Sequence, residues 1–330
     1  TVPNEKTGTF TEDNTVKTKP LEDGVKYFHI VSKDKAGNVG TKASHFRLNI
    51  DTQVHPPMLS SSTHPDEVSW YNSKSVSLHL AKPHDLSGVE GFFYSVDTKP
   101  ATEPQESDWI YTASSEITLQ DRPDGTWYIH VKSKDAAGNI SKGTSHFRFN
   151  IDTVALPPNI SSATHPDPQK WYNSKKAQFK ISPPEDMSGV FGYLYVVDEN
   201  EKAVPDENAS WTDKDTIFTG DLHDGTWYLH VVTKDKAGNI GKNASHYRIN
   251  IDTMAKPPLV YSKTHSDQES WYSNSIPEMH WDTPEDLSGI EGYYYCFDQK
   301  HNTVPARETG EWTTANQVTL PQLQDGIWYF

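Results

Sequence analysis

The sequence predicts an all-β protein made of tandem β-sandwich domains of about 100 residues each, and its internal repetition carries that prediction. The stretch from Asp124 to Asn139, DGTWYIHVKSKDAAGN, recurs with small changes twice in full and once in part. The copies are spaced by 101, 100 and 101 residues, measured at Gly24, Gly125, Gly225 and Gly326. In addition, 22 prolines and 19 glycines divide the 330 residues into short segments, and none of these has the period of an amphipathic helix.

The repeated stretch itself predicts a turn, a half-buried strand and a second turn. Its Asp-Gly step suits a tight turn, because glycine tolerates positive φ. The next residues alternate, with Trp127, Ile129 and Val131 on one face of a strand and more polar residues between them. The carboxylate of Asp135 can then hold backbone N–H groups of a closing turn that ends at Asn139, so a hairpin partner is expected.

Two further strands are expected in every repeat. One alternates at Val76, Leu78 and Leu80, and its counterparts keep the same register in the later copies. The other follows a Ser-Gly loop and carries apolar residues on both faces, including Phe92 and Tyr94, which is typical of a central strand.

The repeats also set the expected domain boundaries. Residues 1–52 are the C-terminal half of a repeat, 53–153 and 154–253 are complete repeats, and 254–330 form a repeat that lacks its last strands. Each boundary carries adjacent prolines, Pro56-Pro57, Pro157-Pro158 or Pro257-Pro258. Adjacent prolines favour extended backbone, so each joint is expected to be a short semi-rigid spacer. Because the chain stops in phase with where it begins, we expect it to be a window of a longer periodic polypeptide or assembly.

Three features resemble the immunoglobulin-like and fibronectin-type-III-like modules of large secreted bacterial surface proteins. They are the turn-separated strands, the aromatic strand opened by Ser-Gly-[Val/Ile], and the strand closed by Asp-x-Ala-Gly-Asn. The resemblance covers the whole chain and implies a tandem array of immunoglobulin-like sandwiches. Such modules serve as stalks, adhesin shafts and enzyme appendages alike, so the resemblance bears on fold more than on function. The Ile-Asp-Thr joint is also similar to the linkers of calcium-stiffened bacterial adhesin shafts.

Composition argues against several kinds of partner. The formal charge is −15 with 45 acidic residues, which disfavours a nucleic-acid partner because phosphates require a basic face. No run of about 18 apolar residues is present, so nothing in this window is expected to span a membrane. The single cysteine, Cys296, cannot form an intrachain disulfide, and we interpret it as a small strand residue.

Recurrent carboxylates make Ca²⁺ the one cofactor that the sequence suggests. They lie at the joints and in the Ser-Gly loops, at Asp51, Asp152 and Asp252 and at Asp85, Asp186 and Asp286. Ca²⁺ takes about six to eight oxygen ligands, and a domain joint can gather them. The alternative is that each aspartate only caps a turn.

Recurrent Trp-Tyr steps are candidates for a glycan platform. They are Trp70-Tyr71, Trp171-Tyr172 and Trp271-Tyr272. Exposed aromatic rings can stack on sugars, and an array multiplies weak contacts. The alternative, which we favour, is that these rings wedge into the edge of the core, because aromatic residues dominate sandwich cores.

Nine of the 15 histidines recur at three places per repeat. These are His29, His130 and His230; His45, His146 and His246; and His64, His165 and His265. The first two sets fall on the outward faces of adjacent hairpin strands. A zinc site needs three or four ligands in closed geometry, and no carboxylate or thiol follows at a characteristic spacing. We therefore interpret the histidines as cross-strand partners that stabilise a sheet face.

The sequence contains no recognisable catalytic or cofactor-binding motif: no nucleophile elbow, no zinc-protease helix and no P-loop. We expect a non-enzymatic structural or spacer segment of an extracellular bacterial cell-surface protein, such as a stalk, an adhesin shaft or a filament-forming array. The alternative is a carbohydrate-binding array attached to a secreted enzyme or adhesin. The expected partners are further repeats of the same chain or neighbouring copies in a filament, with surface glycans or another cell as further candidates.

Overall fold

The structure is a computed structural model that describes residues 2–4, 6–103 and 106–330, and the chain forms two compact units. The first comprises Thr1–Val154 with two short segments, Met187–Gly189 and Asp235–Asn239, and the second comprises the remaining residues. Regular structure is almost entirely β-strand. The one helical element of the described residues is the 3-10 turn η1 (Glu106–Asp108). The predicted all-β class is confirmed.

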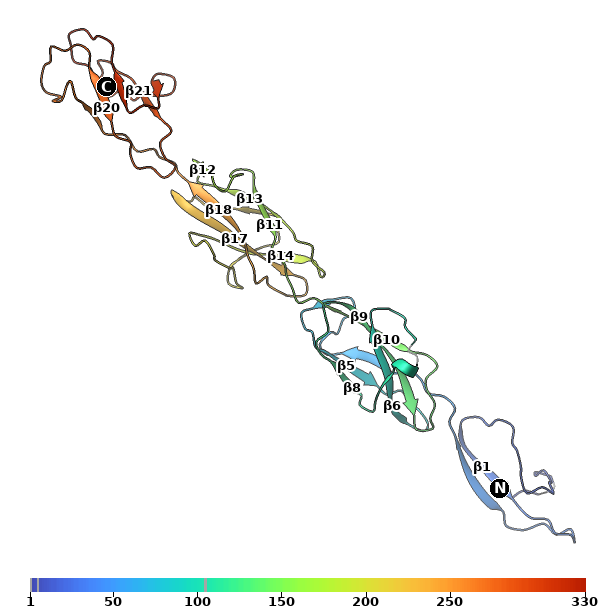
Figure 1. Ribbon diagram of the computed structural model, residues 1–330. Coiled ribbons are helices and arrows are strands. Elements are labelled where there is room, and N and C mark those ends of the chain that lie inside the picture. Colours follow the sequence, from blue (N-terminus) through green and yellow to red (C-terminus); the bar gives the residue numbers. More distant parts are fainter. Residues whose placement is uncertain (1, 5, 104–105) are drawn as a thin grey trace. The chain divides into compact units, whose positions relative to one another are not determined.

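The first unit begins with a two-stranded hairpin (Figure 1, blue). β1 (Gly24–Ile30) pairs antiparallel with β2 (Ser44–Ile50), and the register places His29 opposite His45. Gly24 has φ +117°, so the Asp-Gly step adopts the left-handed geometry that only glycine takes without strain.

The rest of the first unit contains two facing sheets. Their strand orders are β3-β5-β8 and β4-β10-β9-β6-β7. All neighbours are antiparallel except β4, which runs parallel to β10. Figure 1 shows β5 beside β8 and β9 beside β10. The bounds are β3 (Met58–Ser61), β4 (Trp70–Tyr71), β5 (Val76–Ala81), β6 (Val89–Asp97), β7 (Ile110–Thr112), β8 (Glu116–Leu119), β9 (Gly125–Asp135) and β10 (Ser145–Ile151).

Apolar side chains from both sheets form the core between them. Val76, Leu78 and Leu80 of β5 are completely buried, and they pack in one cluster with Phe92 of β6 and Ile129 of β9. Along β5 these residues alternate with more exposed ones, as a period of two requires. The predicted strands around residues 76–80 and 127–131 are confirmed, and so are their core faces.

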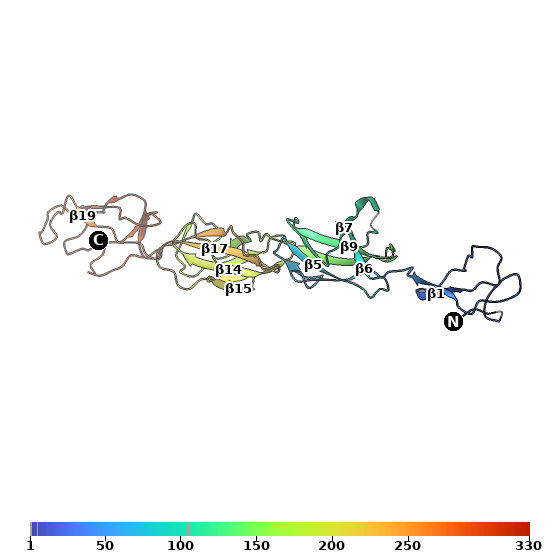
Figure 2. The same ribbon diagram turned by 90° about the horizontal axis from the view of Figure 1, so that it is seen from below.

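The second unit contains the same arrangement. Its sheets have the orders β11-β13-β16 and β12-β18-β17-β14-β15, and Figure 2 shows β14 beside β15 and β17. The core cluster includes Phe179, Ile181, Leu229, Val231 and Ile249, all almost completely buried. The bounds are β11 (Asn159–Ser162), β12 (Trp171–Tyr172), β13 (Gln178–Ser182), β14 (Val190–Asp198), β15 (Ser210–Thr212), β16 (Thr216–Phe218), β17 (Gly225–Asp235) and β18 (Ser245–Ile251).

The last part of the second unit has shorter strands. β19 (Val260–Ser262), β20 (Glu278–Trp281) and β23 (Gln317–Thr319) form one sheet, and β21 (Tyr293–Tyr295) pairs with β22 (Glu311–Thr313). Trp281 is buried at the centre of this part. Its ring centroid lies 5.4 Å from that of Tyr293 and 5.8 Å from that of Phe330.

A β-bulge interrupts β6, and the sequence did not predict it. The register of β6 against β9 shifts between Val89 and Gly91. A Cβ atom built on Gly91 would lie 2.6 Å from the carbonyl oxygen of Thr112, so only glycine fits there. Likewise, a Cβ atom built on Gly192 of the second unit would lie 2.8 Å from the carbonyl oxygen of Thr212.

The hairpin histidines pair across the strands as expected, but His130 and His230 are not exposed. His130 lies opposite His146 in the register of β9 and β10, on the face away from the core cluster. It is nevertheless completely buried. The end of β6 is close by, because Asp97 Oδ1 lies 3.1 Å from Nε2 of His130. An outward position on the strand therefore did not predict exposure to solvent.

Candidate functional site

Three aspartates that are distant in sequence bring their carboxylates together in the first unit. Asp51 follows β2, Asp85 lies in the loop before β6, and Asp135 ends β9. Ligand atoms of all three lie within 4.8 Å of one another. Asp135 is completely buried and the other two are half-buried. Asp51 and Asp85 were predicted from the sequence, whereas Asp135 was given only a role in its turn. The signal available for Asp135 was the recurrence of Asp-x-Ala-Gly-Asn at residues 34–38, 135–139 and 235–239.

Hydrogen bonds hold these carboxylates in place. The backbone N–H of Ser87 donates to Asp51 Oδ2 at 2.9 Å. Asn139 donates to Asp135 from both its backbone N and its Nδ2, each at 2.7 Å, as the predicted turn closure requires. Hydrogen bonds from the Ser87 side chain and then its backbone hold the pKa of Asp51 below its ordinary value, although burial opposes them. The ionised form of Asp51 is therefore favoured without any cation.

The same residues clamp the joint between repeats. Asn139 Nδ2 also donates to the carbonyl oxygen of Asp51, at 3.0 Å. The next residue, Thr52, donates to Asp23 Oδ1 from its backbone N at 3.0 Å and from its hydroxyl at 2.8 Å. In the Ile-Asp-Thr joint, the aspartate therefore binds the loop of the following repeat. The threonine binds the Asp-Gly turn of its own repeat.

Equivalent contacts occur at the next joint. Ser188 N donates to Asp152 Oδ2 at 3.0 Å, and Asn239 Nδ2 donates to the carbonyl oxygen of Asp152 at 2.8 Å. Carboxylate oxygens of Asp152 and Asp235 lie within 4.8 Å of each other, and both residues are buried. Asp186, the counterpart of Asp85, directly precedes the segment Met187–Gly189 in sequence.

The third joint repeats the aspartate contact. Ser288 N donates to Asp252 Oδ2 at 3.0 Å and to Asp286 Oδ1 at 3.1 Å. Hydrogen bonds from Ser288, again the side chain first, hold the pKa of Asp252 below its ordinary value. All six aspartates proposed from the sequence therefore lie in or beside the same kind of joint.

This arrangement suits two roles. Clustered carboxylates can supply oxygen ligands to Ca²⁺, which needs about six to eight of them. They can equally act as caps, since Asp85 Oδ1 accepts a hydrogen bond from the N–H of Gly88 at 2.8 Å. Binding of Ca²⁺ at these joints stays a prediction.

The Trp-Tyr steps form short edge strands in the two complete repeats. β4 and β12 pair with β10 and β18, and the four aromatic residues on them are half-buried. The ring of Tyr71 lies 4.7 Å from that of His64, and its hydroxyl accepts from Asp66 N at 3.1 Å. Trp271, in contrast, is 80% exposed and Tyr272 is 37% exposed. The glycan platform at Trp70, Tyr71, Trp171, Tyr172, Trp271 and Tyr272 stays a prediction.

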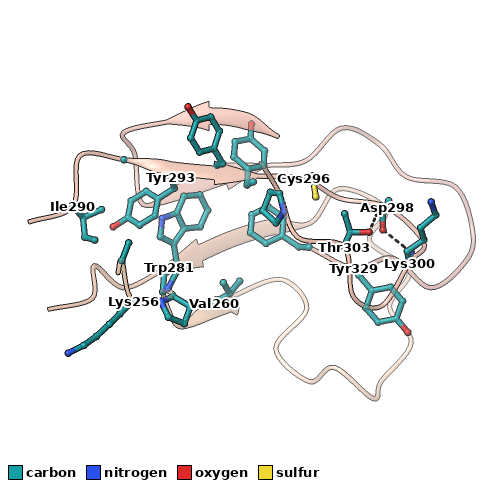
Figure 3. Close-up of a pocket in the computed structure, with 18 of the residues that line it drawn as sticks. Lys256, Val260, Trp281, Ile290, Tyr293, Cys296, Asp298, Lys300, Thr303 and Tyr329 are labelled. Atoms are coloured by element: carbon teal, nitrogen blue, oxygen red, sulfur yellow. Dashed lines mark hydrogen bonds between the residues drawn. The ribbon is translucent and has the colours of Figure 1, made fainter. Parts of the chain in front are cut away.

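A cavity of about 430 Å³ opens in the last part of the second unit. Figure 3 shows Trp281 and Tyr293 side by side on its wall. At its other end, Asp298 accepts hydrogen bonds from Lys300 N and from the Thr303 hydroxyl, each at 2.7 Å. Part of the wall, including Trp281, Tyr293 and Tyr295, is formed by residues whose counterparts in the first unit, on β5 and β6, pack in one cluster with residues of β9 and β10. The cavity is thus an open portion of a sandwich core.

Cys296 also lines this cavity, and its surroundings do not activate it. Burial first and the carboxylate of Asp298 second raise the pKa of the Cys296 thiol. The thiol therefore stays protonated at neutral pH, in line with its interpretation as a packing residue.

Among the described residues, no helix is long and apolar enough to cross a membrane.

Comparisons with known proteins found similarity only to solved structures. No protein family matches the sequence, and no curated protein matches it. The fibronectin(III)-like modules of Clostridium thermocellum CbhA are similar at 9% identity and a TM-score of 0.29, over 59% of this chain and 94% of theirs. The FN1–FN3 domains of chicken CNTN1 are similar at 12% identity and a TM-score of 0.30, over 82% of this chain and 90% of theirs.

The TM-scores are too low to carry an argument, so the fold rests on the sheets of the chain itself. A three-stranded sheet packs on a five-stranded sheet, with the same strand order and a parallel edge strand, in each of the two units. Each unit has its own apolar cluster. The chain is a tandem array of immunoglobulin-like, fibronectin-III-like β-sandwich modules.

Proposed function

We propose that this array is a non-enzymatic spacer segment of an extracellular bacterial surface protein, such as a stalk, an adhesin shaft or a filament-forming array. The repeated joint carries the proposal. At Asp51, Asp152 and Asp252 the carboxylate accepts a hydrogen bond from a serine amide of the following repeat, at 2.9 to 3.0 Å. Adjacent prolines restrict the backbone beside each of these contacts. A joint that recurs with the same contacts suits a segment that holds its ends at a set distance.

The cellular setting of the proposal rests on the resemblance to modules of secreted bacterial surface proteins. The segments that carry it are the Ser-Gly-[Val/Ile] strand opening and the Asp-x-Ala-Gly-Asn turn. The partners in this setting are further repeats of the same chain or neighbouring copies in a filament. The net charge of −15 supports a solvated surface between cells and their surroundings.

Deletion of residues 154–253, one repeat with its joint, tests the spacer role. A sandwich strand of about seven residues at about 3.3 Å per residue, with its end loops, gives about 35–45 Å per repeat. The deletion should therefore shorten the maximum dimension in small-angle X-ray scattering by about that length. An unchanged maximum dimension contradicts the spacer proposal.

Carbohydrate binding is the second candidate, and the exposure of Trp271 favours it. An exposed indole can stack on the face of a sugar ring. A glycan array and cosedimentation with insoluble polysaccharide distinguish the two functions, because a spacer binds nothing in either assay. Binding that is lost in Trp271→Ala and kept in Trp171→Ala, whose ring is half-buried, would replace the spacer proposal.

A further inference from the structure

Two histidines face each other across each described hairpin of this type, and they do so through the same ring atom. The register places them directly opposite on adjacent strands. The Nδ1–Nδ1 distances are 2.7, 2.5 and 2.5 Å for the pairs His130–His146, His230–His246 and His29–His45. The contact between two ring nitrogens is thus a property of the repeat and not of one copy.

A carboxylate lies beside the inner histidine of the two pairs in the complete repeats. His130 and His230 are completely buried. Nε2 of His130 is hydrogen-bonded to Asp97 Oδ1 at 3.1 Å, whereas Nε2 of His230 lies 3.3 Å from Asp198 Oδ1 but makes no hydrogen bond to it. Because an ionised carboxylate can only accept a hydrogen bond, Nε2 of His130 carries the proton when the ring is neutral. Nδ1 of the inner histidine is then left with its lone pair facing the outer histidine.

The outer histidine can present a second lone pair to the same point. In the contact between the two rings, the outer Nδ1 must be the donor. His146 and His246 are exposed, so their proton can instead be carried on Nε2, where water accepts it. Glu103 and Glu201 add negative charge near His146 and His246 respectively, although Glu103 also pairs with Lys132 Nζ at 3.2 Å. Two imidazole nitrogens whose lone pairs can face the same point favour a cation there.

We propose that the pairs His130–His146 and His230–His246 each bind a divalent transition-metal ion through their two Nδ1 atoms, with water completing the coordination. Imidazole nitrogen suits Zn²⁺, Ni²⁺ and Cu²⁺. A carboxylate on the far nitrogen of a ligating histidine fixes the tautomer and orients the ring, which is the role of Asp97 at His130, and Asp198 lies in the equivalent place beside His230. Two nitrogen ligands of a tetrahedral Zn²⁺ lie about 3.3 Å apart, so the exposed ring has to move outward by less than about 1 Å.

A role in sheet stability alone explains the geometry less completely. Cross-strand stabilisation requires the two side chains to touch. It does not require the same ring atom to face inward in each hairpin, nor a carboxylate on the far nitrogen of the buried ring. Sequence spacing concealed the site, because His146 is 16 residues from His130 and Asp97 is 33 residues away on another strand.

Isothermal titration of the metal-free chain with Zn²⁺ tests the proposal. The double variant His146→Ala/His246→Ala should bind two fewer ions per chain than the unchanged protein. Both residues are exposed, so the variant should keep its fold, which circular dichroism and thermal unfolding check. His79→Ala is the matched control: His79 is also an exposed strand histidine, but it lies opposite Glu116, at 2.6 Å, and not opposite a second histidine. This control should leave the number of bound ions unchanged.

Asp97→Asn tests the orienting carboxylate separately. It should weaken Zn²⁺ binding at one of the two pairs about 10- to 100-fold. Titration with Co²⁺ adds a spectroscopic readout, because the visible absorption of nitrogen-ligated Co²⁺ should be lost in the double variant. The proposal is overturned if the unchanged chain binds no Zn²⁺, or if the double variant binds as many ions as the unchanged chain. Unchanged affinity in Asp97→Asn would remove Asp97 from the site.

Discussion

His64 is a fully buried histidine under the Trp-Tyr step. Its ring lies 4.7 Å from that of Tyr71 and 6.1 Å from that of Phe149. Burial lowers the pKa of His64 below its ordinary value, and a weaker hydrogen bond with the backbone of Ser73 opposes that shift. His165 is almost completely buried against an equivalent tyrosine, and its pKa is lowered for the same reason.

We therefore expect the folded chain to lose stability as the pH falls below about 6.5. In that range the unfolded chain binds a proton at His64 that the folded chain does not, so acid favours unfolding until the folded pKa is passed. Urea unfolding at a series of pH values measures the slope. His64→Gln should reduce the slope, whereas His84→Gln, at an exposed position, should leave it unchanged. Equal slopes in all three proteins would contradict the assignment to His64.

Asp135 has a structural role that can be separated from any role in cation binding. It is completely buried and accepts two hydrogen bonds from Asn139. Asp135→Ala removes the acceptor of both bonds at a buried position and leaves Asn139 Nδ2 only the Asp51 carbonyl oxygen, so it should lower the free energy of unfolding by about 1–3 kcal/mol. Asp34 makes the same two bonds to Asn38, at 2.7 and 2.8 Å, but it is exposed, so Asp34→Ala should cost clearly less. Denaturant unfolding monitored by tryptophan fluorescence compares the two variants, and equal losses would show that burial does not decide the cost.

At the scale of the strand, the bulge of β6 depends on a missing side chain. Gly91→Ala forces a Cβ atom to 2.6 Å from the Thr112 carbonyl oxygen, so either the bulge or the β6–β7 pairing must shift. We expect a loss of about 1–3 kcal/mol in the free energy of unfolding, as for other overpacked sites. Gly220→Ala is the control, because a Cβ atom there meets nothing within 4 Å. Thermal unfolding of the two variants checks the prediction, and similar melting temperatures would argue that the bulge adapts.

The strands were largely predictable because a strand shows its two faces in its own sequence. Val76, Leu78 and Leu80 alternate locally, and the Asp-Gly step at Gly125 needs no distant partner to require positive φ. Features that depend on distant strands were not predictable. The carbonyl oxygen that makes Gly91 obligatory belongs to β7, and the carboxylate beside His130 stands at the end of β6.

The residues of the candidate joint were likewise predictable only in part. Its aspartates were found because they recur at fixed places in each repeat. Sequence alone could not reveal that Asp135 lies beside Asp51, because 84 positions separate them and a complete sandwich has to fold to bring them together. The repeat length predicts the number of modules, whereas the contacts of Asp51 with Ser87 and Asn139 needed the structure.

The whole chain is an array in which each module has its own core. The apolar clusters of the two units share no residue, so neither core includes side chains of the other. Stability of such an array is approximately a sum over modules and their nearest-neighbour contacts. The joint is therefore where one module can influence the next. Its contacts are hydrogen bonds of Asp51, Thr52 and Asn139, which local changes can strengthen or weaken.

Calcium is the natural test of that joint, because it would act where the modules meet. A cation held by Asp51, Asp85 and Asp135 binds only the folded chain, so 100-fold excess over its dissociation constant adds about 2.7 kcal/mol to the free energy of unfolding. We expect Ca²⁺ to raise the melting temperature and a chelator to reverse the rise. Asp85→Asn should abolish the response, and Asp13→Asn, at an exposed position outside the joint, should preserve it. Identical melting curves with Ca²⁺ and with chelator would leave the aspartates as caps of their turns, with the joint held by its prolines and by hydrogen bonds from Ser87, Asn139 and Thr52.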